Sequence, residues 1–393
     1  MENFKSCNPR RICIFGFSGI LALCWLYLAL VIINNAISRR SKPEKISEQN
    51  NFEWQETKEN IHDQILRLFK DHSTLEKNEN NENVTKELFE EKKDVFQERF
   101  DPFALSNKVL WDRSFSTPKE DQCLKASFNS RLLEKIVPWG GSTRNEPKIL
   151  CSIYTYHKNH DTNVKATRET WASRCDGFIA FSDQNDAKIP TFKIDHQGDE
   201  SYKNMWQKSR SIWKYVHHWY KDEFDWFLIG GDDMFIIVEN LRKYLSSPEF
   251  KDKTKPYFVG RRFKNLDGTI FNSGGASYLL NAQALKILGE NIDSSICRPN
   301  MRTFGEDVML AKCLSKFNVL PIDTRNELGE ERFHPLTPEH HLRYKKSNDW
   351  YFKYSFDLKY GMDCCSYDSV SFHYIKPALM KDIFHWLYTC RIS

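Results

Sequence analysis

The first apolar segment of the chain covers residues 12–33, which are 22 consecutive positions without a charged side chain. About 20 apolar residues span a bilayer as a helix, so the pattern predicts a transmembrane signal anchor behind a cytosolic tail of residues 1–11. A cleaved signal peptide usually has a shorter apolar region of about 7–15 residues, and the NNAISRR that follows is a poor cleavage site. A buried core helix would rarely lack a charge for so long. We therefore expect an uncleaved anchor.

Polar and charged residues dominate the next region, residues 34–119, which is rich in Glu, Lys, Asn, Gln and Asp. A few apolar residues between positions 61 and 69 have helical spacing. The pattern predicts a solvated, partly helical stem, whose spacing is also compatible with self-association as a homodimer.

Apolar segments typical of strands and helices alternate in the remainder, residues 120–393, most clearly from residue 148. Strands are expected within residues 148–156, 177–182, 224–238 and 256–263, and residues 274–288 are expected to run from a Gly turn through a strand to a helix. Further helices are expected within residues 161–173, 201–220 and 304–319, the last followed by the apolar residues VLPI. Such alternation predicts one α/β domain with a mostly parallel sheet flanked by helices.

Composition narrows the possible partners and the compartment. The 57 Lys+Arg and 53 Asp+Glu leave a formal charge of +4, which argues against binding nucleic acid through its phosphates. Eight cysteines follow the apolar segment: Cys123, Cys151, Cys175, Cys297, Cys313, Cys364, Cys365 and Cys390. An even set in an apolar-rich domain predicts up to four disulfides in an oxidising lumen, with the pairing left open. A zinc site is the alternative, but the chain has no C-x2-C pair. The sequon at Asn83 lies on the same side of the anchor as these cysteines.

The most distinctive polar motif is Gly230-Gly231-Asp232-Asp233, directly after the apolar run at residues 226–229. Open α/β sheets bind ligands beyond the carboxyl ends of their strands. Two adjacent carboxylates there are costly unless a cation offsets them, and a divalent ion shared with substrate phosphates is the usual solution. A solvated turn is the alternative, because these residues are also good turn formers.

Three further motifs each have a functional and a structural interpretation. Glu306 and Asp307 open an expected helix, where acids also serve as ordinary caps. His373 lies among aromatic residues and could equally be a core histidine. The glycines of residues 273–276 allow either a close approach of backbone to ligand or a sharp turn. Motifs of kinases, dinucleotide-binding enzymes, zinc proteases and α/β-hydrolases are absent from the sequence.

A series of blocks between residues 148 and 374 resembles the core 1 β1,3-galactosyltransferases of glycosyltransferase family 31. The blocks are TRETW, DWFLIGGDDMF, FVGRRFK, SGGASYLL, GEDVMLAKC, FHPLTPEHHL and CCSYDSVSFHY. The resemblance implies a GT-A fold, a UDP-galactose donor, Mn2+ and inverting transfer to the 3-hydroxyl of GalNAc-α-Ser/Thr on glycoproteins. The anchor and stem also resemble the type II Golgi membrane layout of that family, with the catalytic domain in the lumen.

The resemblance also implies a metal site. Asp233 and His373 match its metal ligands, and a carboxylate with an imidazole suits Mn2+. Asp232 matches the donor-binding acid of the same motif. Gly231 stands where the family usually has a third aspartate, which puts one metal or donor contact in doubt.

The remaining matches concern donor, acceptor and base. Lys208 matches a lysine that binds the donor phosphates, and Tyr374 is placed to touch the nucleotide. Trp350 resembles an acceptor-contacting tryptophan, although the local spacing is shifted. Asp307 matches the proposed catalytic base, and an inverting transfer needs one carboxylate to take the acceptor proton.

Two alternatives remain open at the level of the sequence. A family member without transfer activity could assist the folding or assembly of an active relative, and Gly231 is the feature that favours this hypothesis. An enzyme of the same fold could use another UDP-sugar, because a few pocket side chains decide the donor.

Overall fold

The computed structural model describes residues 99–102, 131–141 and 146–390, all within one compact unit, Val95–Ser393. The predicted anchor, the sequon at Asn83 and nearly all of the predicted stem lie outside these residues. No helix in the part of the chain that the structure describes is long and apolar enough to cross a membrane.

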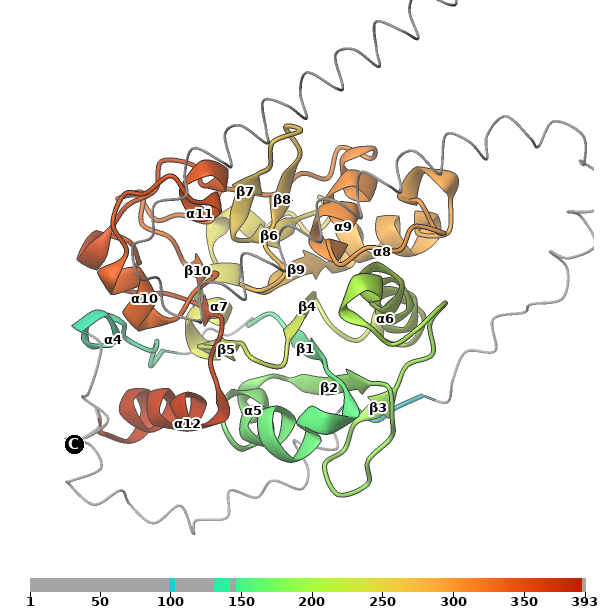
Figure 1. The fold of residues 1–393 in the computed structure, drawn as a ribbon, viewed down its shortest axis with the longest axis horizontal. Coiled ribbons are helices and arrows are strands. Elements are labelled where there is room, and N and C mark those ends of the chain that lie inside the picture. The colour runs from blue at the N-terminus through green and yellow to red at the C-terminus, as the bar shows by residue number, and fades with distance from the viewer. Residues whose placement is uncertain (1–98, 103–130, 142–145, 391–393) are drawn as a thin grey trace, which may run out of the picture. The chain divides into compact units, whose positions relative to one another are not determined.

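A six-stranded, mostly parallel sheet forms the centre of the unit, in the order β3-β2-β1-β4-β9-β6 (Figure 1). Its strands are β1 (Ile149–Tyr154), β2 (Gly177–Ser182), β3 (Phe192–Lys193), β4 (Trp226–Gly231), β6 (Phe258–Gly260) and β9 (Tyr278–Asn281). Strands β3, β2, β1 and β4 run parallel, whereas β9 is antiparallel to both β4 and β6. The mixed α/β architecture with a mostly parallel sheet confirms the sequence-based prediction.

Two apolar cores lie against opposite faces of this sheet. Side chains of neighbouring strand residues alternate between the faces, so Leu150 belongs to one core and Cys151 to the other. Because both faces are covered, β1, β2 and β4 are almost continuously buried, as central parallel strands usually are.

Helices cover both faces. The α-helices among the described residues are α4 (Arg131–Lys135), α5 (Lys165–Glu169), α6 (Met205–Tyr220), α7 (Val238–Leu245), α8 (Ala282–Asn291), α9 (Glu306–Ser315), α10 (Pro338–Arg343), α11 (Trp350–Tyr354) and α12 (Pro377–His385). Helices α6, α8 and α9 pack together on one side, and α5 packs against α12 (Figure 1). The single helix expected over residues 161–173 is instead three short segments: His160–Val164, α5 and Trp171–Arg174.

A second, three-stranded sheet brings distant parts of the chain together. It has the order β10-β11-β5, from β10 (Phe333–His334), β11 (Ser371–Phe372) and β5 (Phe235–Ile236). Strands β11 and β5 pair antiparallel, with Phe372 opposite Phe235. This register places the residues just before β5 beside those just after β11. A two-stranded ribbon, β7 (Arg262–Lys264) and β8 (Ile270–Asn272), completes the strands of the described residues.

Disulfides connect three cysteine pairs in the described part of the chain. Cys151 in β1 bonds to Cys175, and Cys297 bonds to Cys313 in α9. Cys364 bonds to its neighbour Cys365. The expectation of several disulfides in this domain is therefore confirmed, with pairings that the sequence left open.

Candidate active site

A cavity of about 470 Å³ opens beyond the carboxyl ends of β1 and β4, beside the start of α6. Its lining residues are Tyr154, Thr155, Tyr156, Asn159, Glu200, Ser201, Tyr202, Met205, Lys208, Gly231, Asp232 and Asp233. This is the edge of an open α/β sheet where ligands are expected. Gly231, Asp232 and Asp233 therefore line a pocket, at the turn that follows β4.

The two adjacent aspartates have different surroundings. Asp232 is buried, and its carboxylate accepts hydrogen bonds from Thr155 Oγ1 (2.5 Å), Asn159 Nδ2 (2.8 Å) and Asn163 Nδ2 (2.9 Å). Burial raises the pKa of Asp232, and these three donors act in the opposite direction by favouring the carboxylate. Asp232 thus fixes the segment after β1 to the end of β4.

Asp233 lies next to His373, with 3.3 Å between Asp233 Oδ1 and His373 Nε2. The other ring nitrogen, Nδ1, lies 3.2 Å from the Pro335 carbonyl oxygen and donates to it, because a carbonyl only accepts. Nε2 is then the ring nitrogen that faces Asp233. The Ile375 N–H donates to the Asp233 carbonyl at 2.7 Å, which holds the two segments in register.

Tyr374 follows His373 with a positive φ of 57°. Its ring stacks on the imidazole at a centroid distance of 3.9 Å, and about half of its surface stays exposed. An exposed ring fixed in this way offers a flat apolar face to a ligand.

Lys208 reaches the pocket from α6. Its ammonium donates to the Thr155 carbonyl oxygen (2.5 Å) and to Glu200 Oε1 (2.6 Å), and only 3 % of the residue is exposed. A buried cation held at the end of β1 is suited to binding an anion that enters the cavity.

Two carboxyl groups begin α9. Asp307 accepts backbone N–H bonds from Gly274 (2.9 Å) and Val308 (2.8 Å), and burial raises its pKa. Glu306 is fully buried and accepts from Tyr278 Oη (2.6 Å) and Ser209 Oγ (3.2 Å). Burial, reinforced by the charge of Asp307, raises the pKa of Glu306 to about 8. Glu306 is therefore mostly neutral at pH 7, whereas a carboxylate at Asp307 is supported by two donors.

The loop between β8 and β9 contacts both His373 and the two acids of α9. A side chain at Gly274 would overlap Glu306 Oε1 and lie 3.5 Å from Asp307, and one at Gly275 would overlap the His373 ring. Close packing against side chains of the protein itself therefore requires these glycines, which is a reason beside the two that the sequence suggested. The same loop therefore packs against His373 and against the two acids of α9.

Aromatic side chains lie at the mouth of the cavity. Tyr202 is 75 % exposed and stacks on Phe304 at 5.9 Å, with nearly parallel rings. Trp350 is elsewhere: it begins α11 and has ring contacts with Phe263, Tyr351 and Tyr354. Of these aromatic residues Tyr202 lines the cavity, whereas Phe304 and Trp350 do not.

The structure brings six of the seven candidate site residues to this region and leaves Trp350 apart. Three line the cavity, and His373, Tyr374 and Asp307 adjoin it through Asp233 and the glycine loop. Sequence reasoning missed Glu306 as a buried group, together with the polar residues after β1. The latter had a usable signal, because Thr155 and Asn159 directly follow an apolar strand.

Comparison with known proteins agrees with this geometry. The Fringe-like family matches residues 144–325. Glycoprotein-N-acetylgalactosamine 3-beta-galactosyltransferase 1 of Xenopus laevis is 32 % identical over 248 residues, covering 62 % of this chain and 67 % of the relative. Chondroitin sulfate synthase 3 of Homo sapiens is 25 % identical over 194 residues, which cover 45 % of this chain but only 21 % of that protein. The chain therefore belongs to the Fringe-like family, glycosyltransferase family 31.

Proposed function

We propose that the protein is an inverting glycosyltransferase of the GT-A fold. It transfers galactose from UDP-galactose to the 3-hydroxyl of GalNAc-α-Ser/Thr on glycoproteins. The observation that carries this proposal is the meeting of Asp233, His373 and Asp307 around the Gly274–Gly275 turn beside the cavity. The similarity to a glycoprotein-N-acetylgalactosamine galactosyltransferase supports the choice of donor and acceptor.

The residues present fit a divalent metal. Asp233 supplies a carboxylate, and His373 Nε2 points toward it because Nδ1–H is engaged by Pro335. A histidine whose second nitrogen donates to a carbonyl has the orientation typical of metal ligands. This mixed oxygen and nitrogen donor set suits Mn2+, which when bound would offset the charge of the departing diphosphate.

Donor binding is assigned to three residues. Lys208 provides a fixed positive charge for the diphosphate. The exposed ring of Tyr374 stacks on or packs beside the nucleotide. Asp232 acts by holding the segment after β1, which forms one wall of the cavity.

Asp307 is the base. It accepts the proton of the acceptor 3-hydroxyl while that oxygen bonds to the sugar C1 and the C1–O bond to the diphosphate breaks. Burial raises the pKa of Asp307 and so strengthens it as a proton acceptor. A single displacement needs no carboxylate nucleophile, so one base and one metal site are enough. Trp350 would contact an acceptor only as part of an outer surface around α11.

The layout predicted from the sequence completes the proposal. A type II anchor at residues 12–33 would place the catalytic domain in the Golgi lumen, where donor sugars and glycoprotein acceptors meet. Self-association through the stem would give a homodimer.

A panel of UDP-sugars with a GalNAc-α-peptide and Mn2+ tests this function. We expect transfer from UDP-galactose, a β1,3-linked product, and loss of turnover when the metal is chelated. Transfer from a different UDP-sugar would support glycosyl transfer but show that UDP-galactose is not the donor. If protein that still binds UDP transfers no sugar from any donor, the proposed enzymatic activity is wrong.

A non-catalytic, assisting role is the second candidate, and Gly231 favours it. A side chain there would come within 2.9 Å of Asp233 Oδ1 and 3.5 Å of the Tyr154 ring. The Gly231→Asp variant would therefore add a third carboxylate in direct contact with Asp233. If only this variant binds UDP, the natural protein is an assistant and not a transferase.

A further inference from the structure

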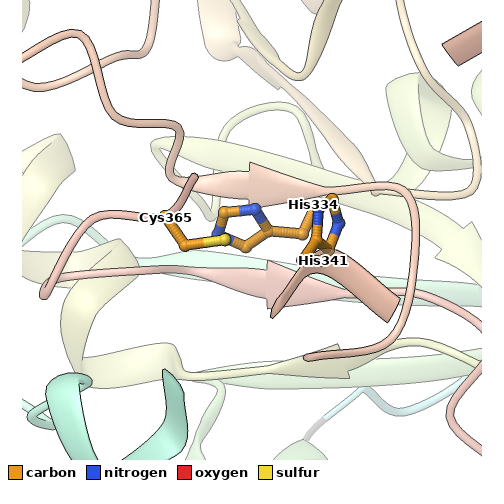
Figure 2. Close-up of side chains that lie close together, drawn as sticks. All are labelled: His334, His341 and Cys365. Carbon is orange, nitrogen blue, oxygen red and sulfur yellow. The ribbon is translucent and has the colours of Figure 1, made fainter. Parts of the chain in front are cut away.

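A buried cluster of two histidines and a cysteine lies outside the cavity. Figure 2 shows His334 from β10, His341 from α10 and Cys365 gathered side by side. One ring nitrogen of each histidine and the cysteine sulfur all lie within 4.8 Å of one another. Each residue is at most 1 % exposed. The three come from segments separated in sequence, so the fold itself assembles the cluster.

The hydrogen bonds of His334 determine which nitrogen is available. Its Nε2 lies 2.9 Å from Ser369 Oγ, and that hydroxyl donates its own proton to the Ser366 carbonyl oxygen at 2.5 Å. Ser369 must therefore accept, so Nε2 carries the ring proton. Nδ1 is left as a bare lone pair, and no described group donates to it. A buried acceptor without a partner costs free energy, and a cation bound there would offset that cost.

His341 presents a second unused nitrogen. Its Nδ1 lies 3.4 Å from the Tyr351 hydroxyl, and its Nε2 has no partner among the described residues. Two imidazole rings with unused nitrogens beside a sulfur are typical zinc donors.

Nearby positive charges are largely paired. Arg261 and Lys135 both lower the pKa of His334, but Arg261 forms an ion pair with Glu331 and Lys135 one with Glu330. These carboxylates reduce the repulsion that a bound cation would meet.

The sulfur of Cys365 cannot bind a metal as a thiolate in this structure, because Cys365 forms a disulfide with Cys364. A disulfide sulfur lacks the thiolate charge that binds zinc. This disulfide joins neighbouring residues, so it closes the shortest loop and constrains the unfolded chain least. The Cys151–Cys175 bridge, with a separation of 24 residues, is a larger constraint. Opening the Cys364–Cys365 bond therefore mainly frees a thiol at the cluster.

We propose that His334, His341 and Cys365 form a zinc site that the Cys364–Cys365 disulfide closes and a thiol reductant opens. A dithiol attacks the Cys364 sulfur, which follows the turn at Gly361–Asp363, and the S–S bond breaks with Cys365 as the leaving thiolate. The second thiol of the reductant then releases Cys364 and forms the oxidised, cyclic disulfide. Two electrons and two protons pass to the protein, and Zn2+ takes the Cys365 thiolate with loss of its proton to water.

This site differs from the one that cysteine spacing would reveal. The chain has no C-x2-C pair. The pairing of β10 with β11 and the position of α10 bring the two histidines close to a single cysteine. The expectation from the sequence that zinc is absent rested on that spacing alone.

Cobalt binding by the full chain in detergent tests the proposal without a reductant. Cys364→Ser leaves a permanent thiol at Cys365, and we expect it to bind a single Co2+ per chain with thiolate-to-cobalt absorption that Zn2+ abolishes. Cys365→Ser is the matched control, because it also leaves one free thiol but removes the sulfur beside the histidines. Equal absorption in both variants, or none in a folded Cys364→Ser protein, would overturn the proposal.

Two further measurements locate the site and cover the case in which Cys364→Ser does not fold. Adding His334→Ala to Cys364→Ser should abolish the absorption, whereas adding Asp233→Ala should leave it unchanged. Wild-type protein should bind one more Zn2+ in native mass spectrometry after a small dithiol has reduced the Cys364–Cys365 pair, as mapped by alkylation, than before. Reduced protein that takes up no additional zinc would contradict the proposal by itself.

Discussion

At the scale of residues, neighbouring acidic residues of the candidate site have different surroundings and therefore different proposed roles. Asp232 and Asp233 are adjacent, yet one carboxylate is occupied by three donors and the other faces His373. Glu306 and Asp307 differ in the same way: Glu306 is enclosed, and Asp307 lies at the glycine loop. In both pairs the sequence shows equal charges, and only the surroundings distinguish the residue proposed for chemistry.

Asp307→Asn should fold and bind UDP with Mn2+ but lose transfer, because an amide cannot accept the hydroxyl proton. Removing a general base typically costs about 10²- to 10⁴-fold in rate. Turnover by the variant is compared with wild type in the same galactose-transfer assay, with UDP affinity as the control for folding. Turnover close to wild type would remove Asp307 from the role of base.

Glu306→Gln should change how stability depends on pH. The folded-state pKa of Glu306, about 8, lies above the ordinary value of 4.5, so the native protein binds more protons than the unfolded chain between these values. This contribution to stability is fully present below about pH 4.5 and is lost as pH rises through about 8. Gln keeps the neutral shape, so the variant should be the more stable protein above pH 8, by on the order of a few kcal/mol.

Thermal unfolding of both proteins from pH 5 to pH 9 measures this effect. The exposed Glu290→Gln on α8 is the matched control and should follow wild type. Parallel curves for wild type and Glu306→Gln would show that Glu306 is ionised in the folded protein.

At the scale of elements, the turn between β8 and β9 holds the two halves of the proposed chemistry together. Gly275→Ala adds a methyl group that overlaps the His373 ring, so His373 must move from its position 3.3 Å from Asp233. We expect metal-dependent UDP binding to weaken sharply in calorimetry. Gly140→Ala is the control, because a side chain there meets nothing within 4 Å. Unchanged binding by Gly275→Ala would place His373 outside the metal site.

The sequence predicts some elements better than others for physical reasons. The strands β1, β2 and β4 were predicted well because buried parallel strands are continuous apolar runs. The helix expected over residues 161–173 breaks at Thr170, where φ is −120°, and Thr170 Oγ1 donates to the Ala166 carbonyl oxygen at 2.7 Å. The strand expected over residues 256–263 divides into β6 and β7 around Arg261, whose side chain is buried and paired with Glu331.

At the scale of the whole molecule, local pattern predicts the α/β class but not which distant residues meet. The pairing of β11 with β5 brings His373 to Asp233 across about 140 positions, and no periodicity in the chain encodes that contact. Family resemblance did suggest this pair. Resemblance also suggested Trp350 for the acceptor, which the fold places on α11, apart from the cavity.

The predicted anchor concerns the whole molecule as well. If residues 12–33 are uncleaved, the mature protein keeps its N-terminus and remains in membranes after carbonate washing. Asn83 should carry a glycan that an N-glycosidase removes. A secreted product that begins after residue 33 would contradict the anchor, and an unglycosylated Asn83 that is protected in the cytosol would contradict the orientation.

Calorimetric titration of UDP at several Mn2+ concentrations tests the central claim most directly. If Asp233 and His373 hold the metal that receives the diphosphate, wild-type protein binds UDP only with Mn2+, and either Asp233→Ala or His373→Ala abolishes that binding. Gly140→Ala should bind like wild type. UDP binding by wild type that is indifferent to Mn2+, or that survives both alanine variants, would contradict the account.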